Sequence, residues 1–85
     1  MSIFREAVLS VVGGIPAGQT LTYQAVADLA GYPRAYRAVG NLLKTNFDPA
    51  IPCHRVICAD GRLGAYNRGA QAKRVLLIAE GAQIG

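Results

Sequence analysis

Two short helical segments separated by only a few residues are the feature that most limits how this chain can fold. Thr22 is a suitable N-cap for a helix over residues 23–30, and Gly31 suits the end of that helix. Pro33 favours the first turn of a further helix that runs to residue 45. Short helices joined by a tight turn that contains glycine are typical of a helix-turn-helix. We therefore expect this motif in the first half of the chain.

The flanking segments extend this prediction to the whole chain. Apolar spacing predicts a helix over residues 3–12 and a last helix over residues 69–81. Between them, residues 54–58 are short and β-branched, Asp60-Gly61 is a turn signal, and residues 63–66 suit a returning strand. The sequence therefore predicts a mainly α, winged-helix-like helix-turn-helix domain with a short β-hairpin and a C-terminal helix.

The size and composition of the chain point to one small folded domain. Its 85 residues suit a single domain, and 52% apolar with 16% charged residues argues against disorder. No apolar run approaches the ~18 residues of a membrane span, and no signal peptide is visible at the N-terminus. We expect one domain over residues 1–85, located in the cytoplasm and not in a membrane.

Positive charge is concentrated in one part of the chain. The net charge is +4, and eight of the nine lysines and arginines lie between residues 34 and 74. In that window the acidic residues are Asp48 and Asp60 alone. A local basic surface of this kind fits a nucleic-acid partner, although many other proteins carry as much charge.

The segment PCHRVIC, residues 52–58, contains both cysteines and the only histidine. It can be a nucleophile with its base, half of a metal site, or a buried strand with an incidental polar pair. A structural zinc site needs four ligands, and Cys53, His54 and Cys58 supply at most three. Adjacent side chains in a strand also point to opposite faces. We therefore expect no metal.

The two cysteines have different expected surroundings. Cys58 alternates with Val56 on the predicted strand and is expected to pack in the core, as free cysteines commonly do. Cys53 follows Pro52 at the junction of loop and strand, where a side chain can be presented to a cleft. His54 is the available neutral base, while a neighbouring arginine or a helix N-terminus can favour a thiolate.

Four stretches in order carry a family resemblance: RAVGNLL, IPCHRVI, DGRLGAYNRG and a final K..LL..EG. From about residue 3 to residue 81 the chain resembles the catalytic, DNA-binding domain of the O6-alkylguanine-DNA alkyltransferases, also called methylated-DNA–protein-cysteine methyltransferases. The resemblance implies a protein without cofactor, acting as a monomer, that flips an alkylated guanine out of duplex DNA. It transfers the alkyl group from O6 to a cysteine, once per molecule. The expected domain over residues 1–85 does not include the N-terminal domain that is common in the family.

The resemblance assigns roles to five active-site residues. Cys53 matches the nucleophile, and His54 matches the base that takes its proton through a bound water. Glu80 matches the carboxylate that orients the histidine, which gives an arrangement like a Ser-His-Asp triad with sulfur as nucleophile. Tyr23 matches the tyrosine that donates to guanine N3, and Asn46 matches the hinge asparagine that ties the helix-turn-helix to the active-site loop.

The resemblance also implies a base pocket and a DNA-binding helix. Val56 and Tyr66 would line the pocket, with Asn67 at its rim. The helix that contains Arg37 would lie in the minor groove, and this arginine would replace the flipped base. Small residues would allow close approach and basic residues would contact phosphates. The remaining expected DNA-binding residues are Arg34, Ala35, Tyr36, Gly40 and Lys44.

Two other functions remain open at this point. Alkyltransferase-like proteins are also small, but they have tryptophan or another residue in place of the nucleophile; they bind the lesion and recruit excision repair. Cys53 favours the enzyme over this alternative. A plain helix-turn-helix regulator would leave IPCHRV and Glu80 unexplained, and it would bind undamaged operator DNA as a dimer.

Overall fold

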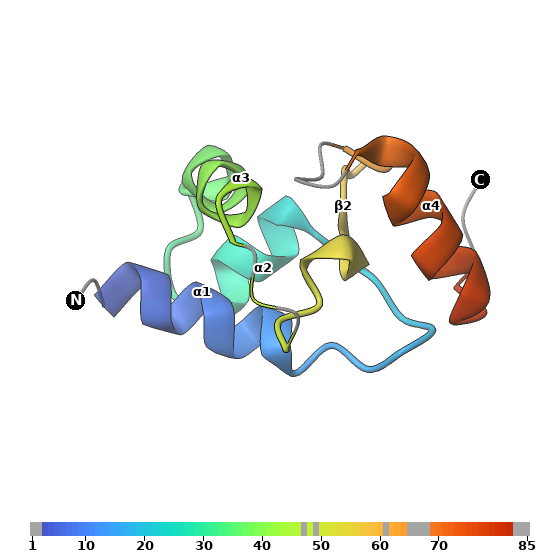
Figure 1. Cartoon of the computed structure of the whole chain (residues 1–85). Coiled ribbons are helices and arrows are strands. Elements are labelled where there is room, and N and C mark those ends of the chain that lie inside the picture. Colours follow the sequence, from blue (N-terminus) through green and yellow to red (C-terminus); the bar gives the residue numbers. More distant parts are fainter. Residues whose placement is uncertain (1–2, 47, 49, 61, 65–68, 83–85) are drawn as a thin grey trace.

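The structure, a computed structural model, describes residues 3–46, 48, 50–60, 62–64 and 69–82. Four helices surround a very small sheet (Figure 1). In chain order the elements are α1 (Ile3–Gly13), β1 (Leu21–Thr22), α2 (Tyr23–Leu29), α3 (Tyr36–Lys44), a 3₁₀ turn η1 (Cys53–Arg55), β2 (Val56–Ile57) and α4 (Ala70–Ala79). The predicted mainly helical class is confirmed.

Both ends of α2 follow the local signals in the sequence. The Thr22 hydroxyl accepts a hydrogen bond from the Ala25 amide at 3.0 Å, as an N-cap does. At the other end the Tyr32 amide donates to the Ala27 carbonyl at 2.9 Å. This closure requires the left-handed backbone of Gly31, whose φ is +90°, because a side chain at that position would be strained.

The helix that follows begins three residues later than predicted. α3 starts at Tyr36, because the Ala35 amide donates to the Tyr32 carbonyl at 2.9 Å and closes a separate turn first. Within this turn the Pro33 carbonyl accepts a hydrogen bond from the Gln24 side chain of α2. The two helices and this turn form the predicted helix-turn-helix, with α3 packed against α2.

The expected β-hairpin is replaced by a different strand pairing. β2 pairs in parallel with β1, with Leu21 opposite Val56 and Thr22 opposite Ile57. The chain does turn back after β2, because the Cys58 amide donates to the Arg62 carbonyl at 2.8 Å. Residues 62–64, however, have no strand structure. β1, at the entry to the helix-turn-helix and far away in sequence, pairs with β2, while residues 65 and 66 of the expected returning strand lie outside the described residues.

A small core of valines joins these elements. Val8 and Val12 of α1, Val26 of α2, Val39 of α3 and Val56 of β2 are all fully buried. Each such burial stabilises the fold by about 1.5–3 kcal/mol relative to an exposed side chain. Figure 1 shows β2 between the helix-turn-helix and α4, so the core holds the segment PCHRV between the two. None of the helices described here is long and apolar enough to cross a membrane.

Candidate active site

Cys53 and His54 lie on the tight turn η1, whereas the predicted strand began at His54. The Cys53 amide donates to the Ile51 carbonyl at 2.8 Å, and the Arg55 amide donates to the Pro52 carbonyl at 3.0 Å. Cys53 is 7% exposed and His54 is 9% exposed, so both side chains are buried. The expectation that neighbouring side chains alternate between faces therefore fails here, since alternation belongs to strands and not to 3₁₀ turns.

The carboxylate of Glu80 lies against His54, although the two residues are 26 positions apart. Glu80 is the C-cap of α4, and its Oε2 is 3.0 Å from His54 Nε2. The Arg55 guanidinium binds the same carboxylate twice, through Nε to Oε1 at 2.9 Å and through Nη2 to Oε2 at 2.6 Å. The structure thus brings together Cys53, His54 and Glu80, here called the relay, and adds Arg55 to it.

The charge state of Glu80 decides which nitrogen of His54 is basic. The hydrogen bond from Arg55 is the main reason why the pKa of Glu80 falls from its ordinary 4.5 to about 2; burial opposes this shift and His54 adds to it. The same pair raises the pKa of Arg55. At neutral pH Glu80 is therefore an anion that only accepts hydrogen bonds. His54 Nε2 must carry the hydrogen in this contact, which leaves Nδ1 as the nitrogen able to accept a proton.

Lys73 is an active-site neighbour that the sequence analysis missed. Its side chain is fully buried, its Nζ donates to the Val56 carbonyl at 2.6 Å, and the same nitrogen lies 5.7 Å from the centre of the Tyr23 ring. Burial lowers the pKa of Lys73 to about 8, against the opposing influence of the Cys58 and Cys53 thiols. Burial also disfavours the charged form of Tyr23 and therefore raises its pKa.

The buried face of α4 also differs from the expected one. The apolar residues of the predicted helix include those at positions 72, 75, 76 and 79, yet Val75 is 55% exposed. Lys73 and Leu77, four residues apart and therefore on one side of the helix, are the buried pair instead. The reason is tertiary: the Val56 carbonyl offers the ammonium group a hydrogen bond. A basic residue four positions before a leucine was the signal in the sequence.

Because of Lys73, we expect the free energy of unfolding to change with pH in the alkaline range. Its pKa in the folded protein is about 8, against an ordinary 10.5, so between these values the unfolded chain binds the proton and the folded chain does not. Stability therefore rises with pH across this window, by up to about 3 kcal/mol. Denaturant unfolding at pH 7.5 and 10 should show this rise in the wild type, with a smaller rise in Lys73→Met.

The control is Lys44→Met, which removes an exposed lysine of α3. It should follow the wild type at both pH values. Parallel pH dependence of the wild type and Lys73→Met would contradict a lowered pKa at this position.

A hollow of about 310 Å³ opens between α3 and the segment after β2. We call it the α3 hollow; it is lined by Tyr23, Tyr36, Arg37, Gly40, Asn41, Lys44, Cys58 and Gly64. Cys58 is thus partly exposed at the wall of the hollow, and the expectation that it packs in the core is wrong. The bond from its amide to Arg62 ends the strand before this residue and directs the chain into a turn.

Gly64 is a second lining residue that the sequence analysis missed. It has a φ of +76°, and a Cβ atom there would lie 3.0 Å from the Tyr23 hydroxyl and 3.2 Å from the Cys58 sulfur. Glycine therefore allows this segment to pack directly against Tyr23. A glycine shortly after an Asp-Gly turn was the available signal.

Most of the predicted DNA-binding residues lie on one exposed helix and the turn before it. Arg34, Tyr36, Arg37 and Lys44 are exposed, and Ala35 and Gly40 are half-buried. The Arg37 guanidinium carbon lies 5.8 Å from the centre of the Tyr36 ring. These positions agree with a basic surface on α3, and the individual roles stay predictions.

The remaining predicted residues are placed as follows. Asn46 is 4% exposed and follows the C-cap residue of α3. Its backbone amide donates to the Leu43 carbonyl at 3.2 Å. Val56 is fully buried in the core, so its role as a pocket wall stays a prediction. Tyr66 and Asn67 lie outside the described residues.

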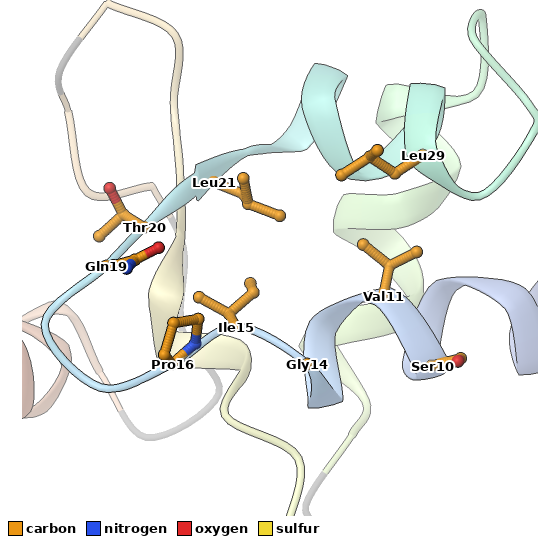
Figure 2. Close-up of a pocket in the computed structure, with 9 residues that line it drawn as sticks. All are labelled: Ser10, Val11, Gly14, Ile15, Pro16, Gln19, Thr20, Leu21 and Leu29. Carbon is orange, nitrogen blue, oxygen red and sulfur yellow. The ribbon is translucent and has the colours of Figure 1, made fainter.

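A larger hollow of about 410 Å³ lies between the end of α1, the loop that follows it, β1 and α2 (Figure 2). It is lined by Ser10, Val11, Gly14, Ile15, Pro16, Gln19, Thr20, Leu21 and Leu29. None of the predicted site residues belongs to it. Its lining lacks a nucleophile with a neighbouring base, so the relay and the α3 hollow are the stronger candidate site. Among the described residues, no three His, Cys, Asp or Glu side chains gather as a metal site requires.

A helix-turn-helix beside a buried cysteine and histidine and a half-buried glutamate defines a DNA-binding domain equipped for thiol chemistry. The comparison with protein families specifies it further. The model of the 6-O-methylguanine DNA methyltransferase, DNA binding domain, matches residues 3–82. The chain belongs to this family.

Relatives of known name and structure agree with this assignment. The methylated-DNA–protein-cysteine methyltransferases of Homo sapiens and Methanothermobacter thermautotrophicus are 40% and 46% identical over 99% and 95% of this chain. The chain spans 41% and 46% of their lengths. The structure of Mycobacterium tuberculosis OGT in complex with DNA matches 94% of this chain and 49% of that one, with 41% identity and a TM-score of 0.88.

A structure of a second type is also similar. S. pombe Atl1, solved in complex with damaged DNA containing O6-carboxymethylguanine, is 32% identical with a TM-score of 0.87. The match covers all of this chain and 82% of that one. M. tuberculosis OGT and S. pombe Atl1 therefore both share the fold of this chain.

Proposed function

We propose that this protein repairs DNA by transferring an alkyl group, such as methyl, from O6 of guanine to Cys53 in a single turnover. The observation that carries the proposal is the contact between His54 and Glu80, 3.0 Å apart and next to a buried Cys53. A thiol becomes a nucleophile when a neighbouring base removes its proton and a third group orients that base. A protein that only binds DNA has no use for this arrangement.

The proposed reaction balances as a displacement at the alkyl carbon. His54 Nδ1 accepts the Cys53 proton through a water molecule, and the thiolate attacks the alkyl carbon. The new S–C bond forms as the C–O6 bond breaks, and the bonding electrons stay on the guanine. Tyr23, which lies at the α3 hollow, donates a hydrogen bond to guanine N3 as this charge develops. The thioether remains on Cys53, so no second turnover follows.

The charge states of Tyr23 and Lys73, which lie near Cys53 and Cys58, suit this chemistry. The thiols of Cys53 and Cys58 are near enough to Tyr23 to raise its pKa further, and near enough to Lys73 to oppose the lowering of its pKa. A lysine with a pKa of about 8 is largely a cation at neutral pH. We infer that Lys73 provides positive charge close to the thiolate and to the leaving guanine.

The DNA partner follows from α3 and its charges. We infer that α3 enters the minor groove, that Arg37 replaces the flipped base, and that Arg34 and Lys44 contact phosphates. Gly40 faces Tyr23, since a Cβ atom there would lie 3.8 Å from the Tyr23 ring; we infer that the missing side chain keeps this part of α3 open to the DNA. Readout in the minor groove is degenerate, which suits a protein that repairs lesions in any sequence. We infer that such a protein works where the DNA is, in the cytoplasmic nucleoid.

Lesion binding without transfer is the second candidate, and one observation favours it. The fold matches that of S. pombe Atl1, solved in complex with damaged DNA containing O6-carboxymethylguanine, with a TM-score of 0.87 and 32% identity. Such a protein would bind O6-alkylguanine and recruit excision repair. The proposed nucleophile Cys53, with its histidine and glutamate, favours the enzyme.

One experiment separates these functions. The protein is mixed with a duplex that carries one O6-methylguanine, and its tryptic peptides are analysed by mass spectrometry. Trypsin separates the two thiols, because residues 45–55 contain Cys53 and residues 56–62 contain Cys58. We expect one methyl group per protein on the first peptide and unmodified guanine in the duplex. A matched duplex with ordinary guanine should transfer nothing.

The other outcomes are equally clear. Preferential binding of the damaged duplex without methyl transfer would exclude the enzyme and support lesion binding. Equal binding of both duplexes without transfer would leave only a general DNA-binding domain.

A further inference from the structure

Arg55 occupies the centre of a set of contacts that joins three distant parts of the chain. Its side chain is 17% exposed, and each of its three nitrogens donates to a protein acceptor. Nε and Nη2 bind the two oxygens of Glu80 at the end of α4. Nη1 donates to the carbonyl of Ile15, in the loop after α1, at 2.7 Å. A planar guanidinium held at three points has little freedom to move.

These contacts determine where the Glu80 carboxylate lies. Glu80 caps the C-terminus of α4, where the helix dipole opposes a negative charge and favours an outward, solvated orientation. The paired hydrogen bonds from Arg55 offset this preference and fix the plane of the carboxylate. In that position Oε2 accepts from both Arg55 Nη2 and His54 Nε2. Glu80 thus orients the imidazole of His54, and Arg55 holds Glu80. None of these hydrogen bonds joins Arg55 directly to His54.

We propose that Arg55 is a positioning residue of the relay: it fixes Glu80 so that His54 keeps its hydrogen on Nε2 and offers Nδ1 as the base. This assigns Arg55 a use other than a direct attraction on the thiolate, because its nitrogens are already directed to Glu80 and Ile15. The catalytic part of this inference rests on the proposed alkyl transfer. The structural part, the tautomer of His54, does not.

The tautomer can be observed directly, because His54 is the only histidine of the chain. The two ring nitrogens are resolved by ¹⁵N NMR of protein with labelled histidine, at pH of about 8, where an imidazole is normally neutral. We expect the Nε2–H form to predominate in the wild type. Arg55→Gln should give a mixture of the two forms. Arg55→Lys, which keeps the charge but lacks the paired geometry, should lie between them.

The matched control is Arg62→Gln. Arg62 also forms an ion pair with a carboxylate, through Nε to Asp60 Oδ2 at 2.8 Å, but both side chains are exposed. This variant should leave the NMR signals of His54 unchanged. Circular dichroism and thermal unfolding identify any variant that fails to fold, and Arg55→Lys then carries the test.

Kinetics test the catalytic part. In Arg55→Gln we expect single-turnover methyl transfer to slow on the order of 10²-fold, the cost of a displaced catalytic group, while the Kd for the damaged duplex stays within a few-fold. Arg55→Lys should recover part of the rate. If Arg55 acts through Glu80, Arg55→Gln should slow transfer little further in a Glu80→Gln protein, since coupled residues are not additive.

Unchanged NMR signals in a folded Arg55→Gln protein would overturn the inference. So would an equal slowing of transfer with and without Glu80, because Arg55 would then act by another route. If the wild type transfers no methyl group at all, the proposed function fails, whereas the NMR measurement still decides whether Arg55 positions His54.

Discussion

Replacing Cys53 with alanine is expected to abolish methyl transfer to the protein while leaving binding of the damaged duplex within a few-fold of the wild type. The thiol forms the new S–C bond, and alanine has no atom that can form it. The substitution removes one sulfur atom from a side chain that is 7% exposed, so the fold should persist at a cost of about 1 kcal/mol. α3, which carries the proposed DNA contacts, is untouched.

Cys58→Ala is the matched control for this prediction. Cys58 lies at the wall of the α3 hollow and is the more exposed thiol, so a purely accessible thiol would react there first. The relay includes Cys53 and not Cys58, and Cys58→Ala should therefore transfer at a rate close to that of the wild type. Methyl transfer by Cys53→Ala, detected on the peptide that contains Cys58, would contradict the assignment of the nucleophile.

Replacing Glu80 with glutamine is expected to slow methyl transfer by about 10²- to 10³-fold, the range of a disabled general base. A neutral amide can still contact His54, but it lacks the charge that stabilises the imidazolium and presents an NH₂ group to Arg55. The rate should be measured by rapid quench in a single turnover with protein in excess, and Kd by fluorescence anisotropy. A lower rate with unchanged Kd is the expected pattern.

The same variant should be less sensitive to acid. The pKa of Glu80 is about 2 in the folded protein and 4.5 ordinarily, so this carboxylate contributes stability above pH 4.5 that is lost as the pH falls toward 2. The contribution is up to about 3 kcal/mol. Glu80→Gln lacks this titration, and the fall in its free energy of unfolding across the window should be smaller.

Asp60→Asn provides the matched control for Glu80→Gln. Asp60 also pairs with an arginine and has a lowered pKa because of the Arg62 backbone and side chain, but it is exposed. The ion pair of an exposed carboxylate contributes little. The Asn variant should transfer methyl at the wild-type rate, and a similar loss of rate in both variants would show that Glu80 has no special role.

Local signals predicted the parts of the fold that depend on neighbouring residues. Thr22 caps α2 through an amide three positions away, and Gly31 supplies the left-handed backbone that ends the same helix. The predicted relay residues came from the motif PCHRV and the distant Glu80, through the family resemblance. The structure then shows Glu80 within hydrogen-bond distance of His54.

The features that escaped prediction all involve partners from distant parts of the chain. β2 pairs with β1, and Leu21 lies opposite Val56 although the two residues are 35 positions apart in the sequence. Lys73 is buried because its Nζ reaches the Val56 carbonyl. The sequence suggested only that Arg55 can favour a thiolate, and its bonds to Glu80 and Ile15 were not predicted.

The order of residues is therefore enough to predict the helices and both ends of α2, and to propose Cys53 as nucleophile and His54 as its base, because these depend on neighbours or on a recognisable motif. The partner of β2, the orientation of α4 and the anchoring of Glu80 by Arg55 follow from packing. They depend on which backbone carbonyls and charged groups meet after the chain has collapsed, and no short stretch of sequence contains both members of such a pair.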